Sequence, residues 1–180
     1  MEPLLRYGYF AGLCEAAKRG LLTREGLDAF LRNLGVLLTI AVNMGLDLAT
    51  AVAAGKYDWI NDSFIGAVWT FVQGCECIAG EQEVVWVDFD FDPTTEQVLA
   101  KMEAEGLRPG NHLELLAVGA AYPDLQQTNP LVALGSSCTV GEYTYVAVLN
   151  GFDAGRNLHL NHRGDKWDRD CRFLAFRIKK

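Results

Sequence analysis

The residues with the most chemical potential stand together near the end of the chain, between residues 156 and 172. Two histidines, His159 and His162, and three aspartates fall within twelve residues there. Imidazole and carboxylate groups can ligate a metal, but a strand sends side chains three positions apart to opposite faces, so these histidines need a bulge or turn to share an ion. Structural zinc sites want four ligands, commonly in paired spacings, and that pattern is missing. We therefore expect no metal and no cofactor.

The same segment is the predicted recognition surface. It combines an aromatic ring, two imidazoles and alternating charges in a region with turn signals, where loops are held by a scaffold. A solvated hairpin loop with salt bridges is the alternative. Large aromatics are usually buried, so we expect Trp167 beneath the loop, with His159 and Arg163 facing a ligand. The predicted binding residues are Arg156, His159, His162, Arg163, Trp167 and Asp168.

Possible nucleophiles are present without the spacing that catalysis requires. Cys75 and Cys77 form a C-x-C pair rather than the redox spacing C-x-x-C, so we expect buried or incidental thiols. Residues 135–138 offer serines and a cysteine, for which His159 or His162 could serve as a base, but no G-x-S-x-G elbow frames the serines. We predict no catalytic residue.

A row of carboxylates precedes the middle of the chain. Asp88, Asp90 and Asp92 alternate with apolar residues over 83–92, which predicts a strand with one acidic face. Stacked carboxylates can hold Mg²⁺ or Ca²⁺, but on an edge strand they more often discourage edge-to-edge pairing, and we expect that role. His112 falls in the first turn of an expected helix, where we expect a surface residue.

The composition is that of a globular protein. Of 180 residues, 50% are hydrophobic and 22% are charged, and the net charge is −7. That charge argues against nucleic acid as a partner, because phosphate affinity comes from clustered Lys and Arg. Residues 156–180 hold eight basic and three acidic residues, which indicates a basic tail strand against an acidic body, or an anion-binding face.

The opening residues and the cysteines indicate a compartment. The chain has five cysteines, an odd number, and they are scattered along the sequence. No basic segment of the kind that begins a signal peptide opens the chain. We therefore expect reduced thiols in a cytoplasmic protein. The longest apolar stretch, 34–54, is broken by Gly35 and Gly45 and carries Asn43 and Asp47. We therefore expect no membrane span.

Spacing predicts an α+β fold with a helical N-terminal part, followed by a small, mainly antiparallel β-sheet domain with two packed helices. Helices are expected over 4–19, along the apolar stripe 27–41, and from Asp47 to Gly55. The apolar surface exceeds what one helix can bury, so we expect a homo-oligomer through these N-terminal helices. The predicted divisions are the helical part (1–55), an aromatic-rich linker (56–82) and an α+β domain with a C-terminal antiparallel sheet (83–180).

Local signals place the later elements. Asp92-Pro93 opens a helix that ends at Gly106, and Asn111 with Glu114 forms a capping box for a helix over 112–120. Short β-rich runs separated by turn residues follow Pro123 and predict the sheet. The expected strands are 131–135, 143–149, 157–160 and 173–178.

Short runs in the last two thirds of the chain form a recognisable signature. They are Ala54–Trp59, Leu115–Gly119, Tyr122–Gln126, Val132–Ser136, Trp167, Asp168 and Arg172–Arg177. Together they resemble a family of uncharacterised bacterial proteins, over about residues 54–180. No activity follows from that resemblance.

The end of the chain has a second resemblance. The strand Arg172–Arg177 follows a loop rich in Trp, Asn and Asp. This order is similar to C-type-lectin-like domains, including the kind found in formylglycine-generating-type proteins. The resemblance implies a binding scaffold whose loops vary.

Taken together, these patterns favour a non-enzymatic binding or interaction module, with a protein or small-molecule ligand at the C-terminal loop. The alternative is a small metal-assisted hydrolase centred on His159, His162 and the nearby aspartates.

Overall fold

The computed structural model describes residues 38–178 except 44, 76–77, 153–154 and 165. The chain divides into two compact units, Met1–Leu38 and Thr39–Lys180, and the described residues belong almost entirely to the second. Among them, no helix combines the length and the apolar character needed to cross a membrane. In chain order the elements are β1 (Thr39–Val42), α3 (Leu48–Gly55), β2 (Trp59–Ile60), β3 (Trp69–Phe71), β4 (Gly80–Glu83), β5 (Val85–Val87), α4 (Thr95–Ala104), β6 (Leu107–Pro109), α5 (His112–Ala121), α6 (Leu125–Thr128), β7 (Leu131–Val140), β8 (Tyr143–Phe152), β9 (Gly155–His162) and β10 (Arg172–Arg177).

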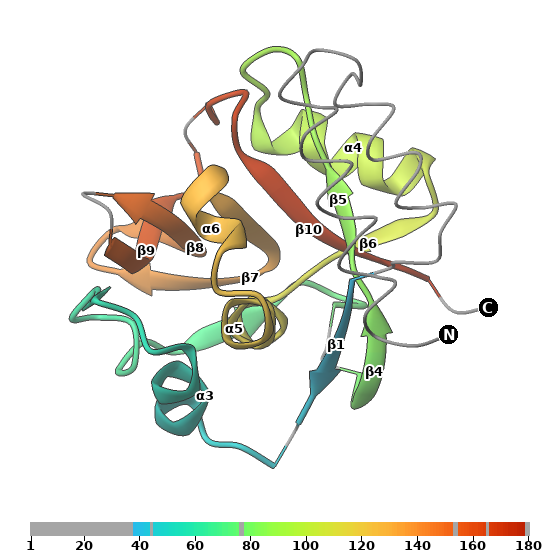
Figure 1. The fold of residues 1–180 in the computed structure, drawn as a ribbon. Helices are drawn as coiled ribbons and strands as arrows, with labels where there is room; N and C mark the ends of the chain where they lie inside the picture. Colours follow the sequence, from blue (N-terminus) through green and yellow to red (C-terminus); the bar gives the residue numbers. More distant parts are fainter. Residues whose placement is uncertain (1–37, 44, 76–77, 153–154, 165, 179–180) are drawn as a thin grey trace, which may run out of the picture. The chain divides into compact units, whose positions relative to one another are not determined.

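An eight-stranded mixed sheet forms the centre of the second unit (Figure 1). Its path runs β2-β9-β8-β7-β10-β5, while β3 pairs with β7 and β6 pairs with β10. Most neighbouring strands are antiparallel, but β10 lies parallel to β7 and β2 lies parallel to β9. A separate antiparallel pair joins β1 to β4. Hairpins therefore build the middle of the sheet, and segments distant in sequence complete it.

The predicted fold class is wrong. We expected a small, mainly antiparallel sheet domain with two packed helices after a helical N-terminal part. The described part of the chain is instead mostly β-sheet, with one large mixed sheet and four short helices. The apolar stripe over 27–41 predicts a helix that includes residues 39–41. These residues belong instead to β1, because they pair with β4. Residues 56–82, expected to be a linker, hold β2, β3 and part of β4. The helices predicted over 4–37, and the self-association assigned to them, lie outside the described residues.

The starts of α3 and α5 follow the local sequence, as predicted. The expected start of α4 at Asp92-Pro93 is wrong, because the Thr94 side chain caps this helix and Gln97 completes its capping box. The Asp47 side chain accepts a hydrogen bond from the Thr50 N–H at 2.9 Å and caps α3. The Asn111 side chain accepts from the N–H groups of Leu113 and Glu114, and the Glu114 carboxylate accepts from the Asn111 N–H. This capping box begins α5, as the sequence predicts. The four expected strands of the last third are confirmed as β7 to β10.

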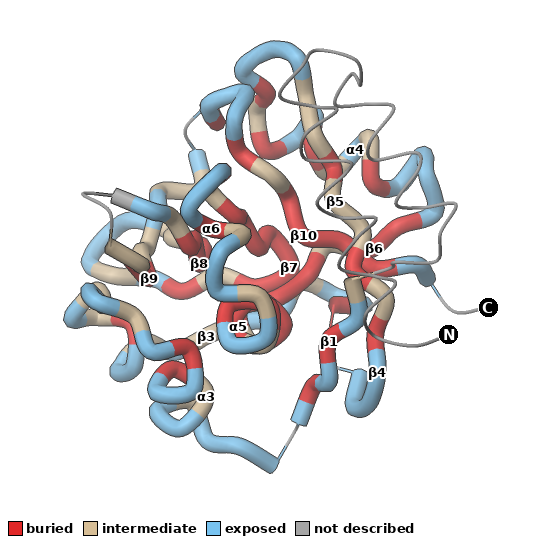
Figure 2. Tube along the Cα trace, viewed as in Figure 1, coloured by how far each residue is buried: buried red, intermediate tan, exposed pale blue. Residues whose placement is uncertain are grey.

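Both faces of the sheet are covered by helices. On one face, Val148 of β8 belongs to the same buried cluster as Val98 of α4. Neighbouring positions on a strand point to opposite faces, so Leu149 points the other way. There it lies beside Gly119, because α5 packs on β7 and β8. Figure 2 shows the resulting buried interior along β7 and β10.

Tyr57 fills the space where α3 and α5 approach each other. A Cβ atom built at Gly55 would lie 2.2 Å from the Tyr57 ring, and one at Gly119 would lie 2.2 Å from its hydroxyl oxygen. Burial raises the pKa of the Tyr57 phenol well above its usual range. The two helices can therefore close on the ring only where both positions lack a side chain.

A buried ion pair joins β6 to the start of α5. The Arg108 guanidinium donates to Glu114 Oε1 at 2.6 Å and to Oε2 at 3.0 Å, and the two side chains are 6% and 0% exposed. The Asn111 N–H also donates to Glu114 Oε2, and the guanidinium lies over the Phe176 ring. The bidentate geometry fixes the direction of the carboxylate as well as its charge.

Removing one partner of this pair should be strongly destabilising. Glu114→Ala leaves the Arg108 guanidinium buried without its carboxylate and removes the Glu114 half of the capping box, so we expect a loss of about 3–5 kcal/mol in the free energy of unfolding. Arg177→Ala is the matched control, because its partner Glu83 lies 3.9 Å away on the surface and such pairs contribute about 0–1 kcal/mol. Urea titration of both variants measures the difference, and equal midpoints would contradict the assignment.

Candidate functional site

Arg156 holds the fold together rather than facing a ligand. One guanidinium nitrogen donates to the carbonyl oxygen of Gly55, and the other donates to Gly119 O at 2.6 Å and to Gln126 Oε1 at 3.2 Å. The guanidinium also lies over the Tyr57 ring, 5.1 Å from its centroid. Carbonyl groups at helix C-termini carry partial negative charge, so a cation is stabilised there. Arg156 therefore ties α3, α5 and α6 to β9.

Trp167 is buried, as predicted. Its ring is 3% exposed, its indole N–H donates to the Thr95 hydroxyl at 3.0 Å, and it meets Phe173 edge to face. Asp168 beside it is exposed and accepts from the Asp170 N–H at 2.8 Å, which stabilises the turn into β10. Trp167 thus supports the loop from beneath and offers no platform to a ligand.

Replacing Trp167 should therefore unfold the loop and weaken the core beneath it. Trp167→Ala should lower the free energy of unfolding by about 3–5 kcal/mol, since a large buried aromatic leaves a cavity. Asp168→Ala, at an exposed position, should cost well under 1.5 kcal/mol. Thermal melts of the two variants measure both values. A Trp167→Ala protein that melts like wild type would show that the indole is not part of the core.

The two histidines of the segment occupy opposite faces of β9. His159 pairs with Val148 and His162 with Tyr145 across the β8–β9 ladder, and alternation separates them. The His159 ring packs against Trp59 at a tilt of 35°, with centroids 4.4 Å apart, and partial burial lowers the pKa of His159. His162 instead meets the edges of aromatic rings on β8. No bulge brings the two imidazoles together.

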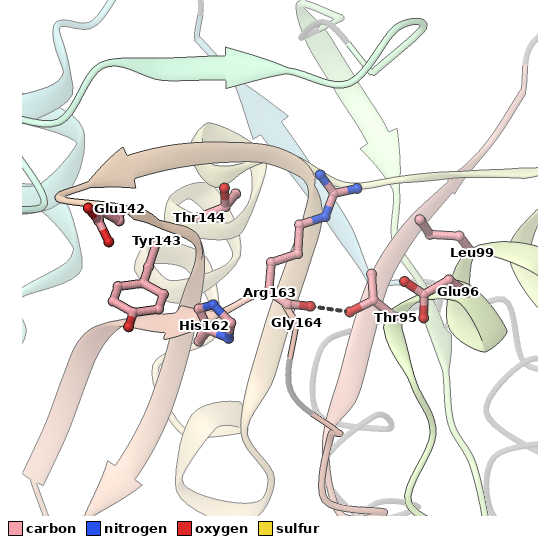
Figure 3. Close-up of a pocket in the computed structure, with 9 residues that line it drawn as sticks. All are labelled: Thr95, Glu96, Leu99, Glu142, Tyr143, Thr144, His162, Arg163 and Gly164. Carbon is pink, nitrogen blue, oxygen red and sulfur yellow. Dashed lines mark hydrogen bonds between the residues drawn. The ribbon is translucent and has the colours of Figure 1, made fainter.

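A groove lies where the end of β9 faces the start of α4 (Figure 3). Its volume is about 560 Å³, and it is open to solvent on one side. Figure 3 shows His162 next to Tyr143, with Arg163 extending between Thr144 and the residues of α4. Its lining residues are Thr95, Glu96, Leu99, Glu142, Tyr143, Thr144, His162, Arg163 and Gly164. Two of the six predicted binding residues therefore share one concave surface.

Charges of both signs meet in this groove. Arg163 supplies a guanidinium, and Glu96 and Glu142 supply carboxylates. The pKa of Glu96 is lowered by its own backbone N–H at the start of α4, then by the Thr94 hydroxyl and the Arg163 charge. The backbone of Arg163 is fixed on both sides: its N–H donates to Thr144 O, and its carbonyl accepts from the Thr95 hydroxyl. The groove thus combines charged groups of both signs with a largely apolar lining, and hydrogen bonds hold the backbone of Arg163 in place.

A serine–histidine pair lies elsewhere in the fold, at the start of α5. His112 is buried, which corrects the expectation of a surface residue. The Ser136 Oγ accepts from the His112 N–H and lies 2.9 Å from His112 Nδ1. The Ser136 hydroxyl therefore bonds both the backbone N–H and the imidazole of His112. The imidazole also stacks on Trp69, with centroids 4.2 Å apart.

Sequence reasoning missed this pair for a physical reason. The register of β7 against β8 shifts between Ala133 and Cys138, so period-two alternation does not predict where the Ser136 side chain points. Ser136 is fully buried, so its hydroxyl anchors the helix rather than attacking a ligand. The only available signal was the capping box itself, which places residue 112 in the first turn.

His112 should make the stability depend on pH. Burial lowers the pKa of His112 from 6.5 to about 4. Between pH 6.5 and pH 4 the imidazole is therefore protonated in the unfolded chain but neutral in the folded chain. Stability is therefore full above pH 6.5 and is lost as the pH falls, by up to about 3 kcal/mol at pH 4. His112→Phe keeps the ring stacking but cannot titrate. Urea titrations from pH 7 to 4 should show a smaller acid loss in that variant, and an unchanged loss would contradict this role.

The strand predicted over 83–92 ends at Val87, so Asp88, Asp90 and Asp92 lie beyond β5 and not on one face of an edge strand. Two of these carboxylates, and the described thiols, have structural roles. Arg172 lies 3.6 Å from Asp88, and Arg169 lies 3.6 Å from Asp92 and also donates its backbone N–H to that carboxylate. The loop before β10 is therefore fastened to the segment after β5. Burial raises the pKa of the Cys171 thiol to about 11, which keeps it protonated and unreactive.

Fold and groove together define a β-rich, helix-covered domain with a concave site that carries charges of both signs. Comparison with known proteins adds no assignment: no family model, no curated protein and no solved structure matches the chain. The resemblances to an uncharacterised bacterial family and to C-type-lectin-like domains therefore stay predictions from sequence.

Proposed function

We propose that the protein is a non-enzymatic binding module whose ligand site is the groove formed by the end of β9, the start of β8 and the first turns of α4. The observation that carries the proposal is the convergence of His162 and Arg163 with Glu96 and Glu142 in one solvent-open cavity. These residues come from the end of β9, the turn before β8 and the first turn of α4. Hydrogen bonds from the backbone of Arg163 join these three segments, to Thr144 of β8 and to Thr95 of α4. A preformed site of this kind binds without having to order a loop.

The chemistry of the lining indicates a small polar ligand that carries an anionic group. A guanidinium binds a carboxylate or phosphate through two parallel hydrogen bonds, and His162 adds a further polar contact. The two glutamates accept hydrogen bonds and favour ammonium or hydroxyl groups elsewhere on the ligand. Tyr143, which is 57% exposed, offers the flat apolar surface of its ring.

Binding is favoured over bond-making because the fold already uses one of the groove's hydroxyls and separates the two histidines. The Thr95 hydroxyl donates to Arg163 O and accepts from the Trp167 indole, so it has no proton to give a substrate. The hydrolase alternative requires His159 and His162 to act together, and the strand separates them. No observation favours that alternative further.

The proposal includes a cytoplasmic location. It is supported by Cys138 and Cys171, which are buried thiols with raised pKa values and form no disulfide, as expected of a protein in a reducing compartment.

A thermal-shift screen tests the proposed site. The probes are panels of amino acids, dicarboxylates, sugars and sugar phosphates, each added to the full chain. A ligand at 100 times its Kd stabilises the folded state by about 2.7 kcal/mol, which raises the Tm of a chain this size by about 5–10 °C. Arg163→Ala should abolish the shift, because the anionic group loses its partner.

Lys166→Ala is the matched control, since Lys166 is exposed in the same loop but does not line the groove. It removes one positive charge, as Arg163→Ala does, and should leave the shift intact. A compound that shifts wild type and Arg163→Ala equally binds elsewhere. A compound that loses its shift in both variants responds to net charge rather than to the groove. Either result would count against the proposal.

A further inference from the structure

The outer edge of β3 is open. β3 pairs with the second half of β7, and within the described residues no other strand pairs with it. The backbone groups of β3 that point away from β7 therefore have no strand partner there. Figure 2 shows β3 beside α5. Such an edge is a template on which another strand can add.

The side chains along this edge are apolar and unprotected. Val68 is 83% exposed, Ile65 is 48% exposed, and Phe71 is 37% exposed. Proteins usually guard an edge strand with charged residues or proline, yet residues 65–73 contain neither. In a chain with a net charge of −7, this uncharged stretch is a place where two copies can meet without repulsion.

The sequence of the edge identifies the partner. Residues 68–72 read Val-Trp-Thr-Phe-Val, which is chemically the same in both directions about Thr70. If a second copy of this strand lies antiparallel to the first, with a two-fold axis at Thr70, each residue faces one of the same chemical type: aliphatic, aromatic or hydroxyl. The pairs across the axis are Val68 with Val72, Trp69 with Phe71, and Thr70 with Thr70.

We propose that the protein forms a two-fold dimer in which β3 pairs antiparallel with β3 of a second copy. Aromatic, β-branched and Thr–Thr pairs are each favourable across neighbouring strands, and this register supplies all three. Directly opposed residues share a face, so Trp69 and Phe71 of the two copies extend the ring stack that begins at His112. The interface is isologous and closes after two subunits.

This dimer is separate from the proposed groove and from the self-association expected of the N-terminal helices. β3 contributes no residue to the groove. Substitutions at β3 therefore leave the ligand site unchanged, and a failure of either proposal leaves the other standing. Thr70 is exposed, so its side chain can be changed without disturbing the core.

Charge reversal at the axis tests the pairing. Thr70→Lys and Thr70→Glu each place two like charges directly opposite each other, which should raise the dimer Kd at least about a hundredfold. An equimolar mixture of the two variants opposes unlike charges and should restore a dimer that contains one copy of each. Thr70→Val keeps the strand uncharged and should dimerise as wild type does. Sedimentation velocity on the full chain at about 50 μM, well above a micromolar Kd, measures each state.

Circular dichroism and melting curves confirm that each variant is folded. The proposal requires a wild-type dimer, two monomeric charged variants and a restored mixed dimer. A monomeric wild type at this concentration overturns it. A dimer that persists in Thr70→Lys places the contact on another surface and overturns it as well. Charged variants that stay monomeric when mixed exclude the two-fold register at Thr70.

Discussion

The carboxylate of Glu114 sets the constraint on which much of the structure depends. It has no exposure to solvent, and a buried charge is tolerated only when it is paired and hydrogen-bonded. Arg108 supplies the pair, and the Asn111 N–H supplies the remaining bond, so β6 and the start of α5 must meet in one orientation. That orientation delivers His112 to Ser136 and lays the rest of α5 along β7 and β8.

A second cation repeats the arrangement at the other end of α5. Arg156 reaches from β9 to carbonyl oxygens near the ends of α3 and α5, so the helix is fastened to the sheet at both termini. The α4 side of the sheet is organised differently. There Trp167 and Thr95 clamp the loop after β9 against the first turn of α4, and the groove lies beside that clamp. These contacts thus frame an open surface that carries charges of both signs.

Local elements could be predicted from sequence because local chemistry determines them. The caps at Asp47 and Asn111 depend on side chains within three residues, and the strands of the last third depend on alternation. The fold class could not be predicted in this way. β1 exists through its pairing with β4, and the parallel contact of β7 with β10 joins segments separated by a hairpin and a loop. No window of sequence carries that information.

The candidate site shows the same division. The segment 156–172 was predicted from its composition and turn signals. These indicated that Trp167 is buried, but they could not show that Arg156 also supports the surface rather than forming it. Arg156 and Trp167 prove to be internal anchors, and His159 points to the other face of β9 from His162. The glutamates of the groove were invisible because they come from α4 and from the β7–β8 turn. Only the fold brings these three segments to one place.

The fit of Tyr57 between Gly55 and Gly119 has a consequence for how this sequence can change. A methyl group at Gly55 would meet the Tyr57 ring, and one at Gly119 would meet its hydroxyl oxygen, at distances no real contact allows, so neither position can accept alanine while residue 57 is tyrosine. A smaller side chain at 57 would free Gly55, whereas a Cβ atom at Gly119 would still lie 2.8 Å from Leu149 Cδ1. The effects of substitution at these three positions are therefore non-additive, as expected of residues in direct contact. As this sequence changes, residue 57 must become smaller before Gly55 can gain a side chain, and both residue 57 and Leu149 must change before Gly119 can.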